Sequence, residues 1–302
     1  MDILINGATG FLGRSLVDNL NKDGHSLKVI TRNTIKASKV LGNDVDYYQW
    51  DSESLELPYE ALKSTDAVVN LMGESVGGIW LPSKKSSIYQ SRLIGTKKLV
   101  QAINKLESGP SILISASAVG YYGNRGDETL NENSEPGTSF LSEVCKDWES
   151  QANSATQSGA RVVTLRLAPI LGPDGGFLIQ QLPLAKLGLL GPLGTGKQWW
   201  PWVHIDDTIN IIKHVLSNPT TGPINVVSPN PINQIDFSKA LAGFYNRPAI
   251  LPAPAFALKL LLGGFSDELL FSRKVIPQKA LDSGFKFKFV DINKAIKASI
   301  KR

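Results

Sequence analysis

Three glycines spaced three residues apart, directly behind an apolar segment at the start of the chain, constrain the fold more than any other feature. Residues 2–6 read Asp-Ile-Leu-Ile-Asn, and residues 6–13 read Asn-Gly-Ala-Thr-Gly-Phe-Leu-Gly. Residues 11–20 then carry apolar side chains at helical spacing. Glycines between a strand and a helix let the backbone approach a pyrophosphate, whose charge the helix N-terminus stabilises. The pattern predicts a nucleotide-binding turn; the alternative is an ordinary strand-to-helix turn.

Strand and helix patterns alternate through the first half of the chain. The expected strands are residues 2–6, 26–31, 45–50, 66–71, 111–116, 161–167 and 223–227, and the expected helices are residues 11–22, 54–63, 85–106 and 138–158. This alternation predicts an α/β fold with a doubly wound parallel sheet over residues 1–168, to which a strand and helix at about 203–228 return. Residues 169–302 are richer in Pro and Gly. We expect them to form mainly a smaller C-terminal substrate lobe, with helices at 206–217, 234–246 and 290–300.

Composition excludes several classes of protein. A single cysteine and three scattered histidines allow no intrachain disulfide and predict no metal site. The net charge of +5 is spread along the chain, so we expect no nucleic-acid partner. The longest apolar run, residues 253–265, is too short to span a bilayer, and no secretory pattern precedes the first strand. We therefore expect a cytoplasmic protein without a membrane partner; the oligomeric state is left open.

The end of the second expected strand bears on which dinucleotide is bound. NAD-selective folds place Asp or Glu there to accept from the ribose 2′-hydroxyl, but residues 31–33 read Thr-Arg-Asn. The Arg32 guanidinium suits a 2′-phosphate, so we predict NADP as cofactor, with NAD as the alternative. The predicted cofactor-binding residues follow the first four strands: Gly7, Thr9, Gly10, Phe11, Leu12 and Gly13 in the turn, Arg32, Asp51 for the adenine amine, and Leu71, Met72 and Gly73 beneath the nicotinamide ribose.

Several further motifs are spread over nearly the whole chain. They are the segments Asn-Leu-Met-Gly-Glu at 70–74, Tyr-Gln-Ser-Arg-Leu-Ile-Gly-Thr at 89–96, Ser-Ala-Ser-Ala-Val-Gly-Tyr-Tyr-Gly at 115–123, Phe-Leu-Ser-Glu-Val-Cys-Lys-Asp-Trp-Glu at 140–149, Gly-Thr-Gly-Lys-Gln-Trp at 194–199 and Trp-Val-His-Ile-Asp-Asp at 202–207. Together with the glycine turn, they resemble the extended short-chain dehydrogenase/reductases, and more closely the atypical "epimerase family" group with its own small C-terminal domain. The resemblance implies a Rossmann fold and a nucleotide site. Members mostly have no assigned reaction, and some carry a cell-division-inhibitor label.

Catalysis is where the chain departs from that superfamily. Its usual triad is Ser or Thr followed by Tyr-x-x-x-Lys on the next helix, where the lysine lowers the pKa of the tyrosine. Here no tyrosine occurs between Gly123 and Trp148. Phe140 or Leu141 falls at the tyrosine position, and Val144 or Cys145 falls at the lysine position.

The remaining candidates for catalysis are Ser117, Tyr121 and Tyr122. Ser117 follows its strand as the catalytic serine of the superfamily does; the alternative is that its hydroxyl satisfies backbone groups. The two tyrosines are the nearest phenols; the alternative is that they pack against the second lobe. The Cys145 thiol is read as a small core residue, with a redox role as the alternative.

Two features of the second region also have alternative interpretations. His204 is a possible base, but we expect Asp206 or Asp207 to cap the helix that follows it. Tryptophans at 199, 200 and 202 line a substrate cleft or pack the lobe.

The sequence therefore predicts an NADP(H)-binding protein, an oxidoreductase or epimerase acting on an unknown small molecule. The alternative is a nucleotide-binding sensor or scaffold that has lost catalysis and is linked to cell division.

Overall fold

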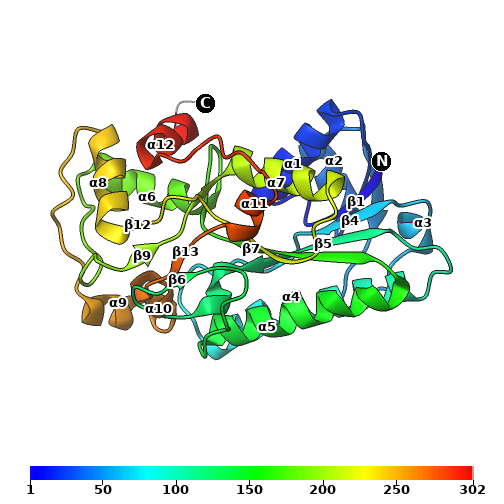
Figure 1. The fold of residues 1–302 in the computed structure, drawn as a ribbon, viewed down its shortest axis with the longest axis horizontal. Helices are drawn as coiled ribbons and strands as arrows, with labels where there is room; N and C mark the ends of the chain where they lie inside the picture. The colour runs from blue at the N-terminus through cyan, green and yellow to red at the C-terminus, as the bar shows by residue number, and fades with distance from the viewer. Residues whose placement is uncertain (301–302) are drawn as a thin grey trace.

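The computed structural model describes residues 1–300, and its centre is a parallel sheet of seven strands between two layers of helices (Figure 1). The strands of this sheet are β1 (Asp2–Asn6), β2 (Ser26–Thr31), β3 (Asp46–Gln49), β4 (Ala67–Asn70), β5 (Ile112–Ala118), β7 (Arg161–Leu167) and β11 (Gly222–Val226). Their order is β11-β7-β5-β4-β1-β2-β3, so the winding reverses between β1 and β4. This is the doubly wound fold that the sequence predicts, and ligands of such sheets bind where the order reverses.

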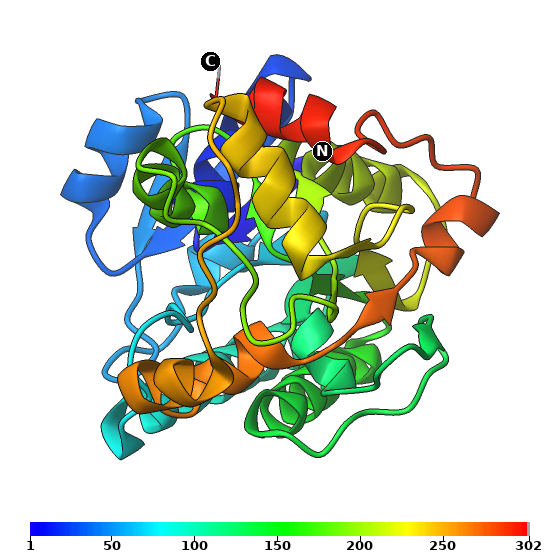
Figure 2. The ribbon, with the colours of Figure 1, turned by 90° about the vertical axis from the view of Figure 1, so that its left-hand side faces the viewer.

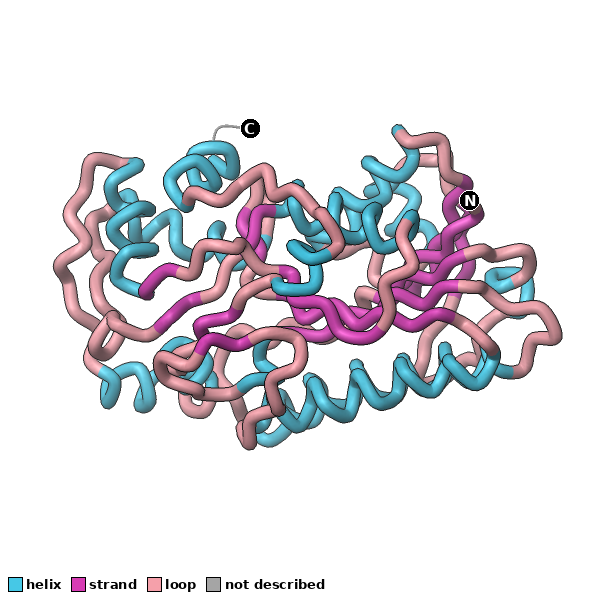
Figure 3. The backbone as a smooth tube through the Cα atoms, in the orientation of Figure 1, coloured by secondary structure: helices cyan, strands magenta, loops and turns pink. Residues whose placement is uncertain are grey.

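Helices cover both faces of the sheet. The helices are α1 (Phe11–Lys22), α2 (Thr34–Leu41), α3 (Tyr59–Leu62), α4 (Pro82–Asn104), α5 (Phe140–Asn153), α6 (Gly176–Lys186), α7 (Ile205–Ser217), α8 (Gln234–Phe244), α9 (Ala255–Leu262), α10 (Phe265–Leu270), α11 (Gln278–Asp282) and α12 (Ile292–Ile300), with short 3₁₀ helices η1 (Val119–Tyr122) and η2 (Ser154–Ser158). In Figures 1 and 3, α1, α2 and α7 lie on one side of the strand layer, and α4 and α5 lie on the other. No helix within residues 1–300 combines the length and apolar character needed to cross a bilayer.

Alternating side chains of the central strands build the two halves of the core. Ile3 and Ile5 of β1 pack in the cluster that holds the buried faces of α1 and α7. Leu4, between them, packs in the cluster formed with α4 and α5. Because successive side chains of a strand point to opposite faces, a strand buried on both faces is apolar at every position. This explains the unbroken Ile-Leu-Ile of the first strand.

The remaining strands form three small pairs outside the central sheet. They are β6 (Thr129–Leu130) with β13 (Lys274–Val275), β8 (Ile170–Leu171) with β10 (Val203–His204), and β9 (Trp199–Trp200) with β12 (Ile232–Asn233). Figure 2 shows α8 beside α12 on one side of this part of the molecule, and α9 with α10 on the other. The α9–α10 pair adjoins the start of α4, because Phe265 packs on Trp80 with ring centroids 5.9 Å apart.

Candidate functional site

The three glycines of the first turn meet three different steric demands. Gly7 has a φ of +81°, and a Cβ there would lie 2.8 Å from the carbonyl carbon of Leu71. A Cβ on Gly13 would lie 2.4 Å from the Gly7 oxygen, so Gly13 allows α1 to pack against the turn. Gly10 is exposed and precedes α1, and its Cβ would meet only the Gly7 oxygen at 3.3 Å. Gly10 therefore leaves the approach to the N-terminus of α1 open for a phosphate.

A cavity of about 220 Å³ lies at the edge of the sheet beside this turn. Its wall includes Gly7, Thr9, Arg32, Asp51 and Met72, which follow four different strands. Of the predicted cofactor residues, these five therefore meet at one hollow, at the point where the strand order reverses. The first turn of α1 contains no acidic residue and no side chain caps it. An anion at this end of the helix would thus meet free backbone N–H groups.

The other predicted cofactor residues surround that cavity in different ways. The Leu71 N–H donates to the Asn6 oxygen at 2.9 Å, which joins the ends of β1 and β4. Leu12 is buried in the core, so only its backbone faces the turn. Phe11 lies under the loop 172–176, where a Cβ on Gly175 would lie 2.3 Å from its ring. Gly73 is exposed and lies against the side chain of Arg92.

A row of buried polar side chains holds the ends of β1 and β4 to the helices below them. The Asn6 amide donates to Asn70 at 2.9 Å, and the Asn70 amide donates to the Thr96 hydroxyl at 3.0 Å. The Trp148 indole donates to the same hydroxyl at 2.9 Å. These residues fix the two strand ends that flank the cavity. The sequence analysis missed them, although an asparagine at the end of each of two neighbouring strands was a usable signal.

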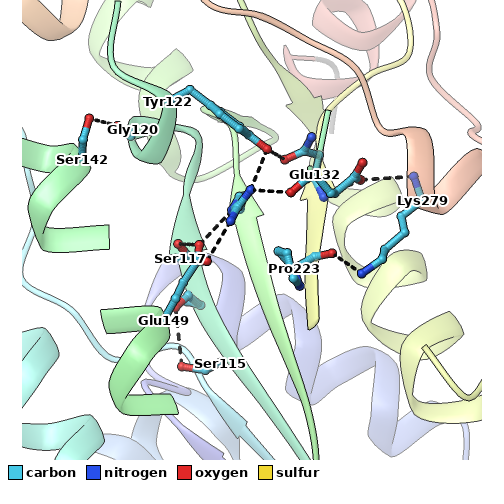
Figure 4. A network of polar contacts seen from close by, with 12 residues as sticks. Ser115, Ser117, Gly120, Tyr122, Glu132, Ser142, Glu149, Pro223 and Lys279 are labelled. Carbon is cyan, nitrogen blue, oxygen red and sulfur yellow. Dashed lines mark hydrogen bonds and ion pairs between the residues drawn. The ribbon is translucent and has the colours of Figure 1, made fainter. Parts of the chain in front are cut away.

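Ser117 lies in a buried polar network beneath the end of β5 (Figure 4). Its hydroxyl donates to the Glu149 carboxylate of α5 at 2.6 Å. The Arg166 guanidinium of β7 binds both oxygens of that carboxylate at 2.9 Å each and donates to the Tyr122 hydroxyl at 3.0 Å. Buried ions are tolerated when they are paired and hydrogen-bonded, as this pair is. The Ser117 hydroxyl is thereby directed at Glu149.

The two candidate tyrosines differ in their access to solvent. Tyr122 is fully buried, and its hydroxyl donates to Asn225 at 2.7 Å (Figure 4). Burial raises the pKa of Tyr122 to about 12, although Arg166 opposes the shift. Tyr121 is only partly buried, and the guanidinium carbon of Arg166 lies 3.5 Å from the centre of its ring. Burial raises the pKa of Tyr121 above its ordinary value, although the charge of Arg166 opposes the shift. Of the two phenols, Tyr121 is therefore the one that is partly exposed to solvent.

Apolar side chains occupy the places on α5 where the superfamily's tyrosine and lysine would stand. Leu141 and Val144 are buried, and Phe140 packs edge-on against Trp80 with ring centroids 5.3 Å apart. Burial raises the pKa of the Cys145 thiol to about 11, so the thiolate is scarce near neutral pH. This placement supports the core interpretation of Cys145.

A second cavity, of about 560 Å³, lies between the start of α5 and α10. Trp80, Phe140 and Phe271 give it an aromatic wall, and Lys85 and Asp267 add charge. The Lys85 ammonium lies 5.1 Å from the centre of the Phe140 ring. This cavity can enclose a small polar molecule with a ring that stacks on aromatic side chains.

One capping prediction for the second region was wrong. His204, rather than Asp206 or Asp207, caps α7, because its Nδ1 accepts from the Asp206 N–H at 3.1 Å. The Asp207 carboxylate instead accepts from the N–H groups of Lys288 and Phe289, which dock the C-terminal segment on α7.

The tryptophans of that region pack the lobe. Trp202 is buried, and the indole N–H of Trp200 donates to the Leu269 oxygen at 3.1 Å. The indole N–H of Trp199 donates to Asp127 at 2.8 Å.

Comparison with known proteins agrees with this architecture. Residues 3–227 match the NAD dependent epimerase/dehydratase family, and residues 253–299 match a domain described only as one of unknown function. The chloroplastic SDR39U1 homologue of Arabidopsis thaliana, an epimerase family protein, is 38% identical, covering 99% of this chain and 86% of its own. The epimerase family protein YfhF of Bacillus subtilis is 35% identical, covering 98% of this chain and 97% of its own.

Solved structures share the fold over the full length of the chain. The human epimerase family protein SDR39U1, crystallised with NADPH, has a TM-score of 0.88 at 29% identity, and all of both chains is covered. A UDP-glucuronic acid 4-epimerase from Bacillus cereus has a TM-score of 0.79 at 17% identity, covering 99% of this chain and 98% of its own, which shows a common fold alone. With its glycine turn, its doubly wound sheet and a family match over residues 3–227, the chain belongs to the NAD dependent epimerase/dehydratase family.

Proposed function

We propose that this protein binds NADP(H) and is an oxidoreductase or epimerase acting on a small molecule. The observation that carries the proposal is the cavity that joins Gly7 and Thr9 of the glycine turn to Arg32, with no acidic residue directly after β2. A guanidinium pairs with a 2′-phosphate, which a carboxylate would repel. The NADPH in the crystal of the human relative supports the same choice.

Asp51 completes the proposed adenosine end of the site. One of its carboxylate oxygens accepts from the Glu53 N–H at 3.1 Å, which fixes the side chain at the cavity wall. Its remaining acceptor capacity suits the adenine amine. The pyrophosphate would lie at the N-terminus of α1, where Gly10 leaves space.

Tyr121 is our candidate for the proton donor. Bound NADPH would supply a hydride, and reduction of a carbonyl also needs a proton at the developing oxygen. Tyr121 follows β5 and is partly exposed. Burial raises its pKa, so the phenol carries its proton near neutral pH, and the Arg166 cation against its ring opposes that shift and would stabilise the phenolate left after proton transfer. Ser117 would act through Glu149 and Arg166 as a positioning residue.

The cavity lined by Trp80, Phe140 and Phe271 is our candidate for the substrate site. Its mixture of aromatic and charged side chains suits a small polar molecule that carries a ring, such as a sugar derivative. Helix α10 and the residue that caps it form one of its walls, since Gly264, Asp267 and Glu268 line it.

A second candidate function is a cofactor-binding sensor or scaffold without catalysis. Phe140 or Leu141 stands where the superfamily's tyrosine would supply a proton, and the Ser117 hydroxyl is directed at Glu149. Both features agree with a cofactor site that has lost its chemistry.

Two assays separate the candidates: NADPH oxidation with small aldehydes and ketones detects a reductase, and a change of configuration in sugar derivatives incubated with the protein and NADP detects an epimerase, which regenerates its cofactor. We expect turnover by the wild type and a decrease of about 10²- to 10⁴-fold in Tyr121→Phe, the usual effect of losing a positioned acid. Tyr122→Phe is the matched control: its hydroxyl bonds Asn131, Arg166 and Asn225, so its loss should lower the melting temperature and spare the chemistry of the folded enzyme.

Two results would count against the enzyme proposal in different ways. Turnover that Tyr121→Phe leaves unchanged would remove Tyr121 from the mechanism and direct attention to Lys146 or His204. Binding of NADPH without turnover of any compound would favour the sensor.

A further inference from the structure

Arg92 of α4 reaches the end of β4, on the far side of the glycine turn from Arg32. Its Nη1 donates to the backbone oxygens of Glu74 and Ile88, both at 3.0 Å. The guanidinium then lies over Gly73, where an added Cβ would be 3.1 Å from the Arg92 Cζ. The centre of the Trp148 ring, on α5, lies 5.1 Å from the Arg92 Cζ. The guanidinium is thus held between the strand end and α5.

The charge of Arg92 has no counterion within the described part of the chain. No carboxylate of residues 1–300 lies within ion-pairing distance of it, and the Glu74 carboxylate pairs with Lys84 at 2.7 Å. Within the same residues, both hydrogen bonds of the guanidinium come from Nη1, so Nε and Nη2 have no acceptor. Burial lowers the pKa of the guanidinium, which reflects the cost of holding this cation away from water. A partly buried cation with unused donors is suited to bind a polar or anionic ligand.

The position of Arg92 in the sheet indicates which half of a dinucleotide it would meet. A doubly wound sheet binds one mononucleotide half on each side of the point where the strand order reverses, here between β1 and β4. Arg32 follows β2, on the side of the adenosine half with its 2′-phosphate. Arg92 covers Gly73, which follows β4, on the side of the other half. Its neighbour Ser91 lines the same cavity as Gly7 and Arg32.

Gly95 allows α4 to come this close to the strand end. A Cβ at Gly95 would lie 1.5 Å from the terminal methyl group of Met72, so any other residue would displace either the helix or Met72. The terminal methyl group of Met72 therefore fills the space that Gly95 leaves between α4 and the end of β4.

We propose that Arg92 binds the nicotinamide ribose half of NADP(H), donating from Nε and Nη2 to its oxygen atoms. The inference rests on the proposed function and adds to it a residue that positions the reactive half of the cofactor. Arg92 also gives the site a fixed positive charge from α4. Helix α5 does not supply one, because it has no lysine at 144 or 145, the position of the superfamily's lysine.

Fragments of the cofactor test this assignment. We would titrate the wild type, Arg92→Met and Arg92→Lys with NADPH and with 2′,5′-ADP, which contains only the adenosine half and its 2′-phosphate. Arg92→Met should weaken the binding of NADPH by about 10- to 100-fold, the usual effect of losing hydrogen bonds from a charged group, and leave the affinity for 2′,5′-ADP unchanged. Arg92→Lys keeps the charge without the planar fork and should give a smaller loss, again for NADPH alone. Arg32→Ala is the matched control and should weaken both ligands.

The outcomes distinguish this inference from the proposed function. Equal losses for NADPH and 2′,5′-ADP in both Arg92 variants would show that Arg92 only supports the loop that follows β4, and unchanged affinities would remove it from the site. If Arg92→Met fails to fold, the ratio of the two affinities in Arg92→Lys decides. A wild type that binds neither ligand would overturn the cofactor assignment itself, and this inference with it.

Discussion

At the scale of single residues, the structure explains how Ser117 becomes part of a buried network of charged side chains. Its place at the end of β5 was predictable, because strand and turn patterns fix that end. Its partner was not: Glu149 lies 32 residues further on, and the ion pair with Arg166 depends on α5 crossing beneath β7. Tyr122 illustrates the same limit, since the burial of its hydroxyl depends on Asn225, 103 residues away. Sequence spacing indicates which groups are near a strand end, and tertiary packing decides which of them face a ligand.

Glu132 provides a prediction about pH at this scale. Its carboxylate accepts from the N–H groups of Asn225 and Lys279, yet burial raises its pKa above the ordinary value. An acid whose pKa is higher in the folded state adds stability when protonated, and that stability is lost as pH rises through the folded pKa. Glu132→Gln keeps a neutral acceptor at the same place. We expect the variant to gain stability relative to the wild type as pH rises from about 4, below the ordinary pKa of a glutamate, to about 8, by about 1.4 kcal/mol for each unit by which the pKa is raised.

Urea unfolding of both proteins at the two pH values checks this prediction. A stability difference that does not change with pH would show that Glu132 keeps an ordinary pKa in the folded protein.

At the scale of elements, the sequence predicted the central strands well and some helices poorly. The expected helix at 54–63 is only α3, residues 59–62, since the chain turns after Asp51, whose oxygen accepts from the N–H groups of Ser54 and Leu55. Helix α2, over 34–41, was not anticipated because Ala37 is its only buried residue, so no apolar periodicity marks it. A local signal was present: the Asn33 side chain caps this helix by accepting from the Lys36 N–H.

The same substitution should have different effects at two glycines of the turn. Gly10→Val should abolish NADPH binding and keep the fold, because its side chain would enter the space at the N-terminus of α1 and its Cβ meets only one oxygen at 3.3 Å. Gly13→Val is the contrasting variant: its Cβ would lie 2.6 Å from the Ala8 Cα, so α1 must shift and the melting temperature should fall. Circular dichroism and NADPH titration on the same samples compare the two. Full affinity in Gly10→Val would mean that the turn is only structural.

At the scale of the whole molecule, residues after 168 pack against the segments that follow β1 and β5 of the central sheet. The loop 172–176 covers Phe11 of the glycine turn, and β13 pairs in parallel with β6, which lies in the segment that follows β5. Arg273 donates to the Gly123 oxygen across 150 residues of sequence. Contacts of this range leave no periodic pattern, so the doubly wound sheet could be predicted from the sequence but the closure of the site by the later residues could not. The cofactor side of the site depends mainly on the first four strands, which is why more of it was predictable.

The relative affinities of the protein for NADPH and NADH test the proposed role of Arg32 in the cofactor site. Calorimetric titration of the wild type and Arg32→Ala with each cofactor measures the contribution of the one charged group that follows β2 at the cavity. We predict that the wild type binds NADPH at least about tenfold more tightly than NADH, as a charge-assisted contact with a phosphate implies, and that Arg32→Ala loses this preference. Equal affinities of the wild type for the two cofactors, or a preference for NADPH that survives in Arg32→Ala, would contradict it.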